Sequence, residues 1–181
     1  MVNRPLAAFL CLVVLSPVTG CGYTTKTLLP ENVHTVTVLP VKNAIDLSAE
    51  ISDKDHFRVY RPGLEVDVTN AMINRFIFDG NLKVVKPDKA DLVVEAKLID
   101  YRRDVLRYNA GNEVEEYRLN VVLDVAVYQA SDKKELWHES NLVGDTTSFV
   151  TGRRAVNEDE AVAKAVEDVA RRVVEKTVEL W

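Results

Sequence analysis

Apolar and polar residues alternate along the second half of the chain, which is the pattern of β-strands with one buried face. The clearest segment has an apolar residue at every second position, namely Tyr117, Leu119, Val121, Leu123, Val125 and Val127. Arg118, Asn120 and Asp124 lie between them and are expected on the opposite face. Residues 91–101 alternate in the same way, and residues 136–143 are expected to return as the last strand. Together these segments predict a half-buried antiparallel sheet.

Two shorter strands are expected nearer the N-terminus, at residues 33–41 and 82–86. In the first, Val36 and Val38 share one face. Each segment ends at or near a proline, which lacks the N–H group that a central strand needs.

The connections are predicted from residues that favour turns. Residues 109–112 are Asn-Ala-Gly-Asn, which tolerates positive φ, and residues 131–134 turn the chain again. Residues 42–60 have no sustained apolar period and carry several acids, so we predict a solvated loop there.

Two segments have the three- and four-residue apolar spacing of amphipathic helices. The first is expected over residues 64–78, with the apolar stripe Leu64, Val68, Ala71, Met72 and Phe76, widened by Ile73 and Ile77. The second follows Asn157, a residue that can cap a helix, and Glu160 stands where a capping box expects it. Its stripe is Val162, Ala165, Val166, Val169, Ala170, Val173, Thr177 and Leu180.

One sheet with a single apolar face and two amphipathic helices bury their apolar surfaces together when both helices lie on that face. We therefore predict an α+β fold, a two-layer sandwich of a mainly antiparallel sheet with two amphipathic helices on one face.

The N-terminal residues have the pattern of a lipoprotein signal peptide. An apolar run over residues 7–14 follows Arg4 and is shorter than the ~20 residues of a transmembrane helix. Small residues then precede Cys21, which suits cleavage next to a diacylated thiol. An ordinary secretory signal with an incidental cysteine is the alternative. Gly22 after the cysteine, rather than Asp, favours sorting to the outer membrane.

This interpretation sets the expected organisation of the chain. Residues 1–20 are the lipoprotein signal peptide, 21–32 a lipidated tether that starts at Cys21, and 33–181 a single α+β domain. The other cysteine, Cys11, lies in the signal peptide, so no thiol remains for a disulfide, a cysteine metal ligand or a nucleophile.

Composition and motifs disfavour several functions. The chain has 23 Lys+Arg against 28 Asp+Glu, which disfavours nucleic-acid binding. His34, His56 and His138 have no carboxylate or second histidine at ligand or catalytic spacing, and no nucleophile-elbow, metalloprotease or phosphate-loop motif occurs. Glu115 and Glu116 are strand neighbours that point to opposite faces. We expect no enzyme activity, no cofactor and no metal site.

Four segments of the chain form a recognisable set. They are Cys21-Gly22-Tyr23, Tyr60-Arg61-Pro62-Gly63-Leu64-Glu65, Ala90-Asp91-Leu92, and the stretch from Tyr108 to Leu119 that contains Gly111 and Glu116-Tyr117-Arg118-Leu119. Together they resemble the LptE family of lipopolysaccharide-assembly lipoproteins over nearly the whole mature chain. Residues 44–59 depart from the family, whose link into the first helix is usually shorter.

The resemblance implies a non-enzymatic role. Family members sit as a plug in the outer-membrane β-barrel LptD, help it to assemble, and bind lipopolysaccharide on its way to the outer leaflet. This chain would then be held by acyl chains at the outer membrane, on the periplasmic side. The main alternative is an outer-membrane lipoprotein that activates a periplasmic cell-wall synthase or scaffolds a secretion complex, which the short tether disfavours. A lipid-anchored hydrolase would need a nucleophile and a base that the sequence does not offer.

Lipopolysaccharide carries phosphates and carboxylates, so a basic patch is the expected binding site. The predicted topology places the turn after Arg107 and the loop that holds Arg153 and Arg154 at the same end of the sheet, with Arg102 and Arg103 as further candidates. The family's basic residues lie in the hairpin itself and before the last helix, whereas this hairpin tip is Asn-Ala. Solvated surface arginines are the alternative interpretation.

Overall fold

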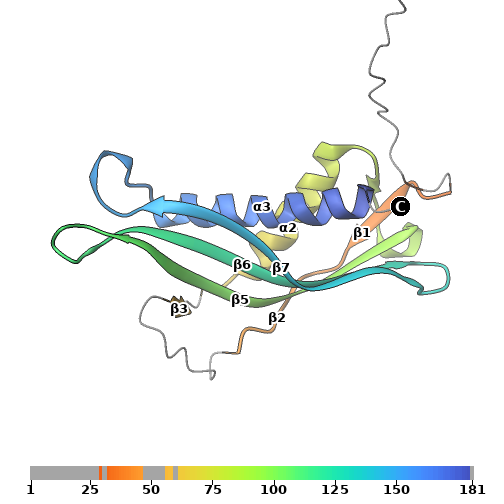
Figure 1. The fold of residues 1–181 in the computed structure, drawn as a ribbon. Coiled ribbons are helices and arrows are strands. Elements are labelled where there is room, and N and C mark those ends of the chain that lie inside the picture. The colour runs from red at the N-terminus through yellow and green to blue at the C-terminus, as the bar shows by residue number, and fades with distance from the viewer. Residues whose placement is uncertain (1–28, 30–31, 47–55, 59–60, 180–181) are drawn as a thin grey trace, which may run out of the picture.

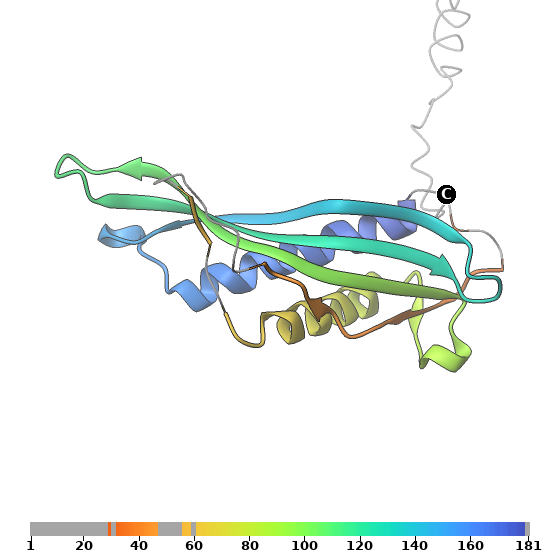
Figure 2. The same cartoon turned by 90° about the horizontal axis from the view of Figure 1, so that it is seen from below.

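The computed structural model describes residues 29, 32–46, 56–58 and 61–179 of the chain. Their strands are β1 (Thr35–Val38), β2 (Lys42–Asn43), β3 (His56–Arg58), β4 (Lys83–Val84), β5 (Leu92–Tyr108), β6 (Val114–Gln129) and β7 (Glu135–Phe149). Their helices are α2 (Leu64–Asp79), α3 (Glu158–Glu179) and the short 3₁₀ turns η1 (Pro87–Lys89) and η2 (Gly152–Arg154). Both α-helices cover the same face of one sheet (Figures 1 and 2). The predicted α+β two-layer sandwich is confirmed.

Three long strands, β5, β6 and β7, form the antiparallel centre of the sheet. Leu98, Leu123 and Leu142 are aligned across these three strands, and all three are buried. A β-bulge after Leu98 shifts the register by one residue. Tyr101 therefore also points into the core and is fully buried, although it follows Leu98 by an odd number of residues.

The two helices bury the predicted apolar stripes. α3 packs across β6 and β7, and α2 lies beside α3 and over β1 and β4. The buried stripe residues are Leu64, Val68, Met72 and Phe76 in α2, and Val162, Ala165, Val166, Val169, Ala170, Val173 and Thr177 in α3. One expectation is wrong, because Ile77 is 63% exposed instead of widening the stripe of α2. Ile77 follows the fully buried Phe76 by one position, so it lies about 100° around the helix from that residue and faces away from the core. Leu180 lies outside the described residues.

The start of β1 is held by one carboxylate. Asp91 Oδ2 accepts hydrogen bonds from the backbone N–H groups of His34 (3.0 Å) and Thr35 (2.9 Å) and from the Thr35 hydroxyl (2.7 Å). β1 then runs parallel to both β4 and β5, so the sheet is mixed at this side. These bonds fix where the chain enters the fold.

The predicted loop over residues 42–60 needs a correction. β2 pairs parallel with β5, and β3 pairs antiparallel with it, while residues 47–55 and 59–60 lie outside the described residues. Lys42 and Asn43 are exposed, so their strand has no apolar alternation that a sequence could reveal. Backbone hydrogen bonds to β5 alone define it, including the one from Ala44 N–H to Leu98 O at 2.8 Å.

α3 begins as expected in part. Asn157 Oδ1 accepts a hydrogen bond from the backbone N–H of Asp159 (3.2 Å), which caps the helix. Glu160 does not complete the capping box but forms an ion pair with Lys164 (2.7 Å). In the part of the chain that the structure describes, neither helix combines the length and apolar character that crossing a bilayer requires.

Candidate functional site

The β5–β6 turn and the segment after β7 meet at one end of the elongated molecule (Figure 2). Phe149, the last residue of β7, pairs with Glu116 of β6. The chain then continues through Val150, whose N–H donates to Glu115 O at 3.0 Å, and Val156, whose N–H donates to Phe149 O at 3.1 Å. These backbone bonds hold the loop that contains η2 against the hairpin.

Phe149 brings two predicted site residues together. The guanidinium carbon of Arg154 lies 4.5 Å from the centroid of the Phe149 ring, and that of Arg107 lies 5.8 Å from it. Both distances are within the range of cation–π contacts. Arg107 Nη2 is also 3.5 Å from Glu116 Oε2. Residues from β5 and η2 that are far apart in sequence therefore share one aromatic ring.

The other arginines at this end differ in their partners. Arg153 is exposed in η2, and no carboxylate of the described residues lies within 4.0 Å of Arg153 or Arg154. Arg102 is paired with Asp100 at 2.9 Å, and Arg103 is paired with Glu158 at the start of α3. Arg102 and Arg103 therefore do not join the patch as available cations. The name arginine patch is used below for Arg107, Arg153 and Arg154.

Exposed apolar side chains lie beside the arginine patch, and the sequence did not indicate them. Leu106, Tyr108 and Val150 are 43%, 43% and 44% exposed. They lie at the ends of β5 and β7, beyond the region that the helices cover. Apolar residues at these positions are therefore exposed, although apolar residues on the same strands are buried under the helices. This end therefore combines guanidinium groups with apolar surface, which suits an anionic amphiphile.

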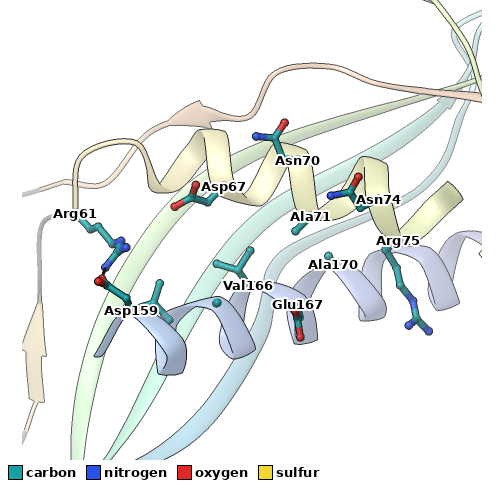
Figure 3. A pocket seen from close by; sticks show the side chains of 12 residues that line it. Arg61, Asp67, Asn70, Ala71, Asn74, Arg75, Asp159, Val166, Glu167 and Ala170 are labelled. Carbon is teal, nitrogen blue, oxygen red and sulfur yellow. Dashed lines mark hydrogen bonds and ion pairs between the residues drawn. The ribbon is translucent and has the colours of Figure 1, made fainter. Parts of the chain in front are cut away.

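A second candidate is the groove between α2 and α3, of about 530 Å³, shown in Figure 3. Arg61 Nη1 and Asp159 Oδ1 are 2.8 Å apart at its end, and this hydrogen bond raises the pKa of Arg61 above its usual value. Asp67, Asn70 and Asn74 line the α2 side. The groove holds no histidine or nucleophilic side chain, and its charged groups are of both signs.

On the open face of the sheet, Asp124 contacts two basic side chains. His138 Nε2 lies 2.6 Å from Asp124 Oδ1, and Lys97 Nζ lies 3.4 Å from Asp124 Oδ2. The hydrogen bond from His138 contributes most to lowering the pKa of Asp124. Sequence spacing did not reveal this pair, because the β6–β7 pairing brings together residues that are 14 positions apart. Among the described residues no cluster of three metal-ligating side chains occurs.

Cys21, the predicted lipidation site, lies outside the described residues.

Comparison of the sequence with known families gives the family of this chain. The family model for LptE, described as lipopolysaccharide-assembly, matches residues 34–177 of this chain. The chain belongs to the LptE family. As an LptE-family member it is an envelope lipoprotein of lipopolysaccharide assembly, a role in which the family is not catalytic. The resemblance seen in the sequence is confirmed.

Several solved structures are similar to this chain at low sequence identity. The hypothetical protein CT253 of Chlamydia trachomatis is 14% identical with a TM-score of 0.51, and the match covers 80% of this chain and 95% of that one. A PelC dodecamer structure from Paraburkholderia phytofirmans has 13% identity, a TM-score of 0.47 and coverages of 83% and 93%. The rare lipoprotein B of Shewanella oneidensis has 16% identity, a TM-score of 0.42 and coverages of 77% and 89%. No curated protein matches the sequence.

Proposed function

We propose that this protein plugs an LptD-like outer-membrane β-barrel, assists the assembly of that barrel, and binds lipopolysaccharide through the arginine patch. Acyl chains on Cys21 would hold it at the outer membrane on the periplasmic side. The observation that carries the binding role is that Arg107 and Arg154 both make cation–π contacts with the ring of Phe149. The family membership supports the rest.

The chemistry of the patch fits a phosphorylated, acylated sugar. Guanidinium groups bind phosphate and carboxylate oxygens with paired hydrogen bonds, and Arg153 and Arg154 have no carboxylate of the described chain to compete. The neighbouring exposed side chains of Leu106, Tyr108 and Val150 offer apolar surface to the acyl part of the same molecule.

The shape of the molecule supports the plug role. β5 has 17 residues, which corresponds to about 55 Å at ~3.3 Å per residue. The apolar band of an outer-membrane barrel is only ~25 Å tall. A long, narrow two-layer domain of this kind can lie inside a large barrel and extend beyond it, as plug domains do in barrels of about 22 strands.

The binding role is tested by a lipopolysaccharide titration of Arg107→Gln with Arg154→Gln. Glutamine removes both charges without adding repulsion toward Glu116. We expect a several-fold loss of affinity that is larger at low salt, because exposed charges are screened as salt rises. Lys133→Gln with Lys134→Gln is the matched control, since these lysines lie in the turn at the opposite end of the sheet (Figure 1).

The titration is run at two salt concentrations beside a melting curve that excludes unfolding. Equal losses in the two variants would mean a diffuse electrostatic effect and would remove the arginine patch as the site. The plug role has its own test, the affinity purification of the acylated protein from outer membranes. A co-purifying large β-barrel supports the proposal, whereas a cell-wall synthase or a secretion complex in its place contradicts it.

A further inference from the structure

The end of α2 presents the two most exposed large apolar side chains among the described residues. Phe78 is 79% exposed and Ile77 is 63% exposed. The guanidinium carbon of Arg75 lies 5.3 Å from the Phe78 ring centroid, a cation–π contact that leaves most of the side chain exposed. Neither side chain takes part in the arginine patch. An aromatic and a β-branched side chain together in the last turn of a surface helix indicate a contact with something apolar.

This apolar pair lies at the end of the molecule where the chain enters the fold. The backbone N–H of Lys83 in β4 donates to His34 O at 2.9 Å, and β4 pairs in parallel with β1. Lys83 follows Phe78 by five positions, a span of at most about 18 Å. Figure 1 shows the end of α2 and the start of β1 together, opposite the β5–β6 hairpin.

The predicted acyl anchor is within reach of the same place. Cys21 precedes His34 by 13 positions, and a chain of that length spans at most about 47 Å at ~3.6 Å per residue. A lipid anchor at Cys21 therefore limits how far this end of the domain can move from the bilayer. The bilayer is therefore an apolar surface that the acyl anchor itself would bring near Ile77 and Phe78.

Charged residues around the apolar pair are suited to a phospholipid surface. Lys83, Lys86 and Lys89 follow the helix, and all three are exposed. No carboxylate of the described residues lies within 4.0 Å of their ammonium groups. Of the two acids in the same stretch, Asp79 Oδ2 accepts a hydrogen bond from Asn81 Nδ2 at 2.8 Å, and Asp88 is exposed. Lysine stems extend along apolar surface while their charges reach anionic headgroups.

We propose that the end of α2 is a membrane-contact surface, in which Ile77 and Phe78 enter the interface of the phospholipid leaflet that holds the acyl anchor. Lys83, Lys86 and Lys89 contact its anionic headgroups. The proposal rests on the acylation of Cys21 and is independent of the barrel and of lipopolysaccharide. Its consequence is a defined orientation of the domain, because the end of α2 and the arginine patch lie at opposite ends of the molecule (Figure 1).

The test uses the full acylated protein in vesicles of phosphatidylethanolamine and phosphatidylglycerol. Because Cys21 carries lipid, a single introduced cysteine is the only free thiol and accepts one nitroxide label. We expect the label in Phe78→Cys to collide several-fold more with oxygen, relative to a polar nickel chelate, than a label at a control position in the same vesicles. The control is Val66→Cys, near the start of α2 and 54% exposed, whose label is expected to stay in water.

Two outcomes overturn the proposal. A label at position 78 that remains as accessible to the polar chelate as the label at position 66 would show that Phe78 does not meet the bilayer. Spin–spin broadening between labels on different molecules would show that a second copy covers this surface instead. Since these vesicles contain neither barrel nor lipopolysaccharide, either result leaves the proposed function untouched.

The lysines are tested in the same vesicles. Lys83→Gln, Lys86→Gln and Lys89→Gln combined with the label at position 78 should make the label shallower in phosphatidylglycerol-containing vesicles and have no effect in vesicles of phosphatidylcholine alone. Arg153→Gln with Arg154→Gln, at the opposite end, should change neither. Equal effects of the two sets would remove the lysines from the proposed surface.

Discussion

Gly144 of β7 lies so close to Val169 of α3 that a Cβ atom at position 144 would be 2.4 Å from the Val169 Cβ atom. The same Cβ would be 2.6 Å from the carbonyl oxygen of Ala165. Asp168, the residue before Val169, accepts a hydrogen bond from the backbone N–H of Asp145 at 3.1 Å. α3 thus packs closely on β7 at Gly144 and also bonds a backbone group of the adjoining residue.

Gly144→Ala is expected to separate β7 from α3 and to lower the free energy of unfolding by about 1 to 3 kcal/mol or more, since both obstructing atoms belong to or adjoin the backbone. Urea denaturation measures the loss. Gly111→Ala is the matched control, because a Cβ there meets only a side-chain oxygen of Asn109 at 3.2 Å. Equal losses in the two variants would contradict the close packing of α3 on β7.

Leu123 and Asp124 test the register of β6. Leu123 is fully buried, so Leu123→Ala should cost about 2 to 5 kcal/mol of unfolding free energy, and Val169→Ala, on the facing helix, should also be costly. Asp124 pairs with His138 and Lys97 on the open face, where partly exposed ion pairs contribute about 1 kcal/mol or less. If chemical denaturation showed a larger loss of unfolding free energy for Asp124→Ala than for Leu123→Ala, the face of β6 assigned to the core would be wrong.

Asp91 should make stability depend on pH in the acid range. Hydrogen bonds from the His34 backbone N–H, then from the Thr35 hydroxyl, lower the pKa of Asp91 in the folded protein. Its contribution is therefore complete above the unfolded pKa of about 3.9 and is lost as pH falls through the lower folded pKa. Asp91→Asn should be less stable than the unchanged protein at neutral pH, and the difference should shrink as the pH drops below about 4.

The measurement for Asp91 is a series of urea unfolding curves from neutral to acid pH. Asp88→Asn, an exposed neighbour in η1, is the control and should leave the curve unchanged. A stability difference for Asp91→Asn that stays constant down to the lowest pH would show that the carboxylate charge is not what holds the start of β1.

Cys21→Ser tests the predicted anchor. Without the thiol the chain cannot be acylated, so we expect an unprocessed or mislocalised protein. Mass spectrometry of the mature N-terminus of the unchanged protein should show an acylated Cys21 as its first residue. An unmodified cysteine, or cleavage at another position, would contradict the prediction and would also remove the basis of the membrane-contact surface.

Much of the fold was predictable because it follows from local periodicity. The alternation in β5 and β6 and the stripes of α2 and α3 each report a face that must be buried, and one sheet face with two helices has one compact arrangement. Asn157 is visible as a cap because its role is local, involving the N–H of Asp159 two residues away. The basic residues of the candidate site were also visible, since topology alone places the ends of β5 and β7 together.

The sequence alone determined the class of fold, the faces of the long strands and helices, and the family, because these depend on patterns of residues close to one another in the chain. Only the tertiary structure decided that Phe149 joins Arg107 to Arg154, that Arg103 is instead paired with Glu158, and that β2 and β3 extend the sheet. It also decided the exposure of Ile77 and Phe78. The reason is that such contacts and exposures depend on which element, distant in the sequence, packs against each position.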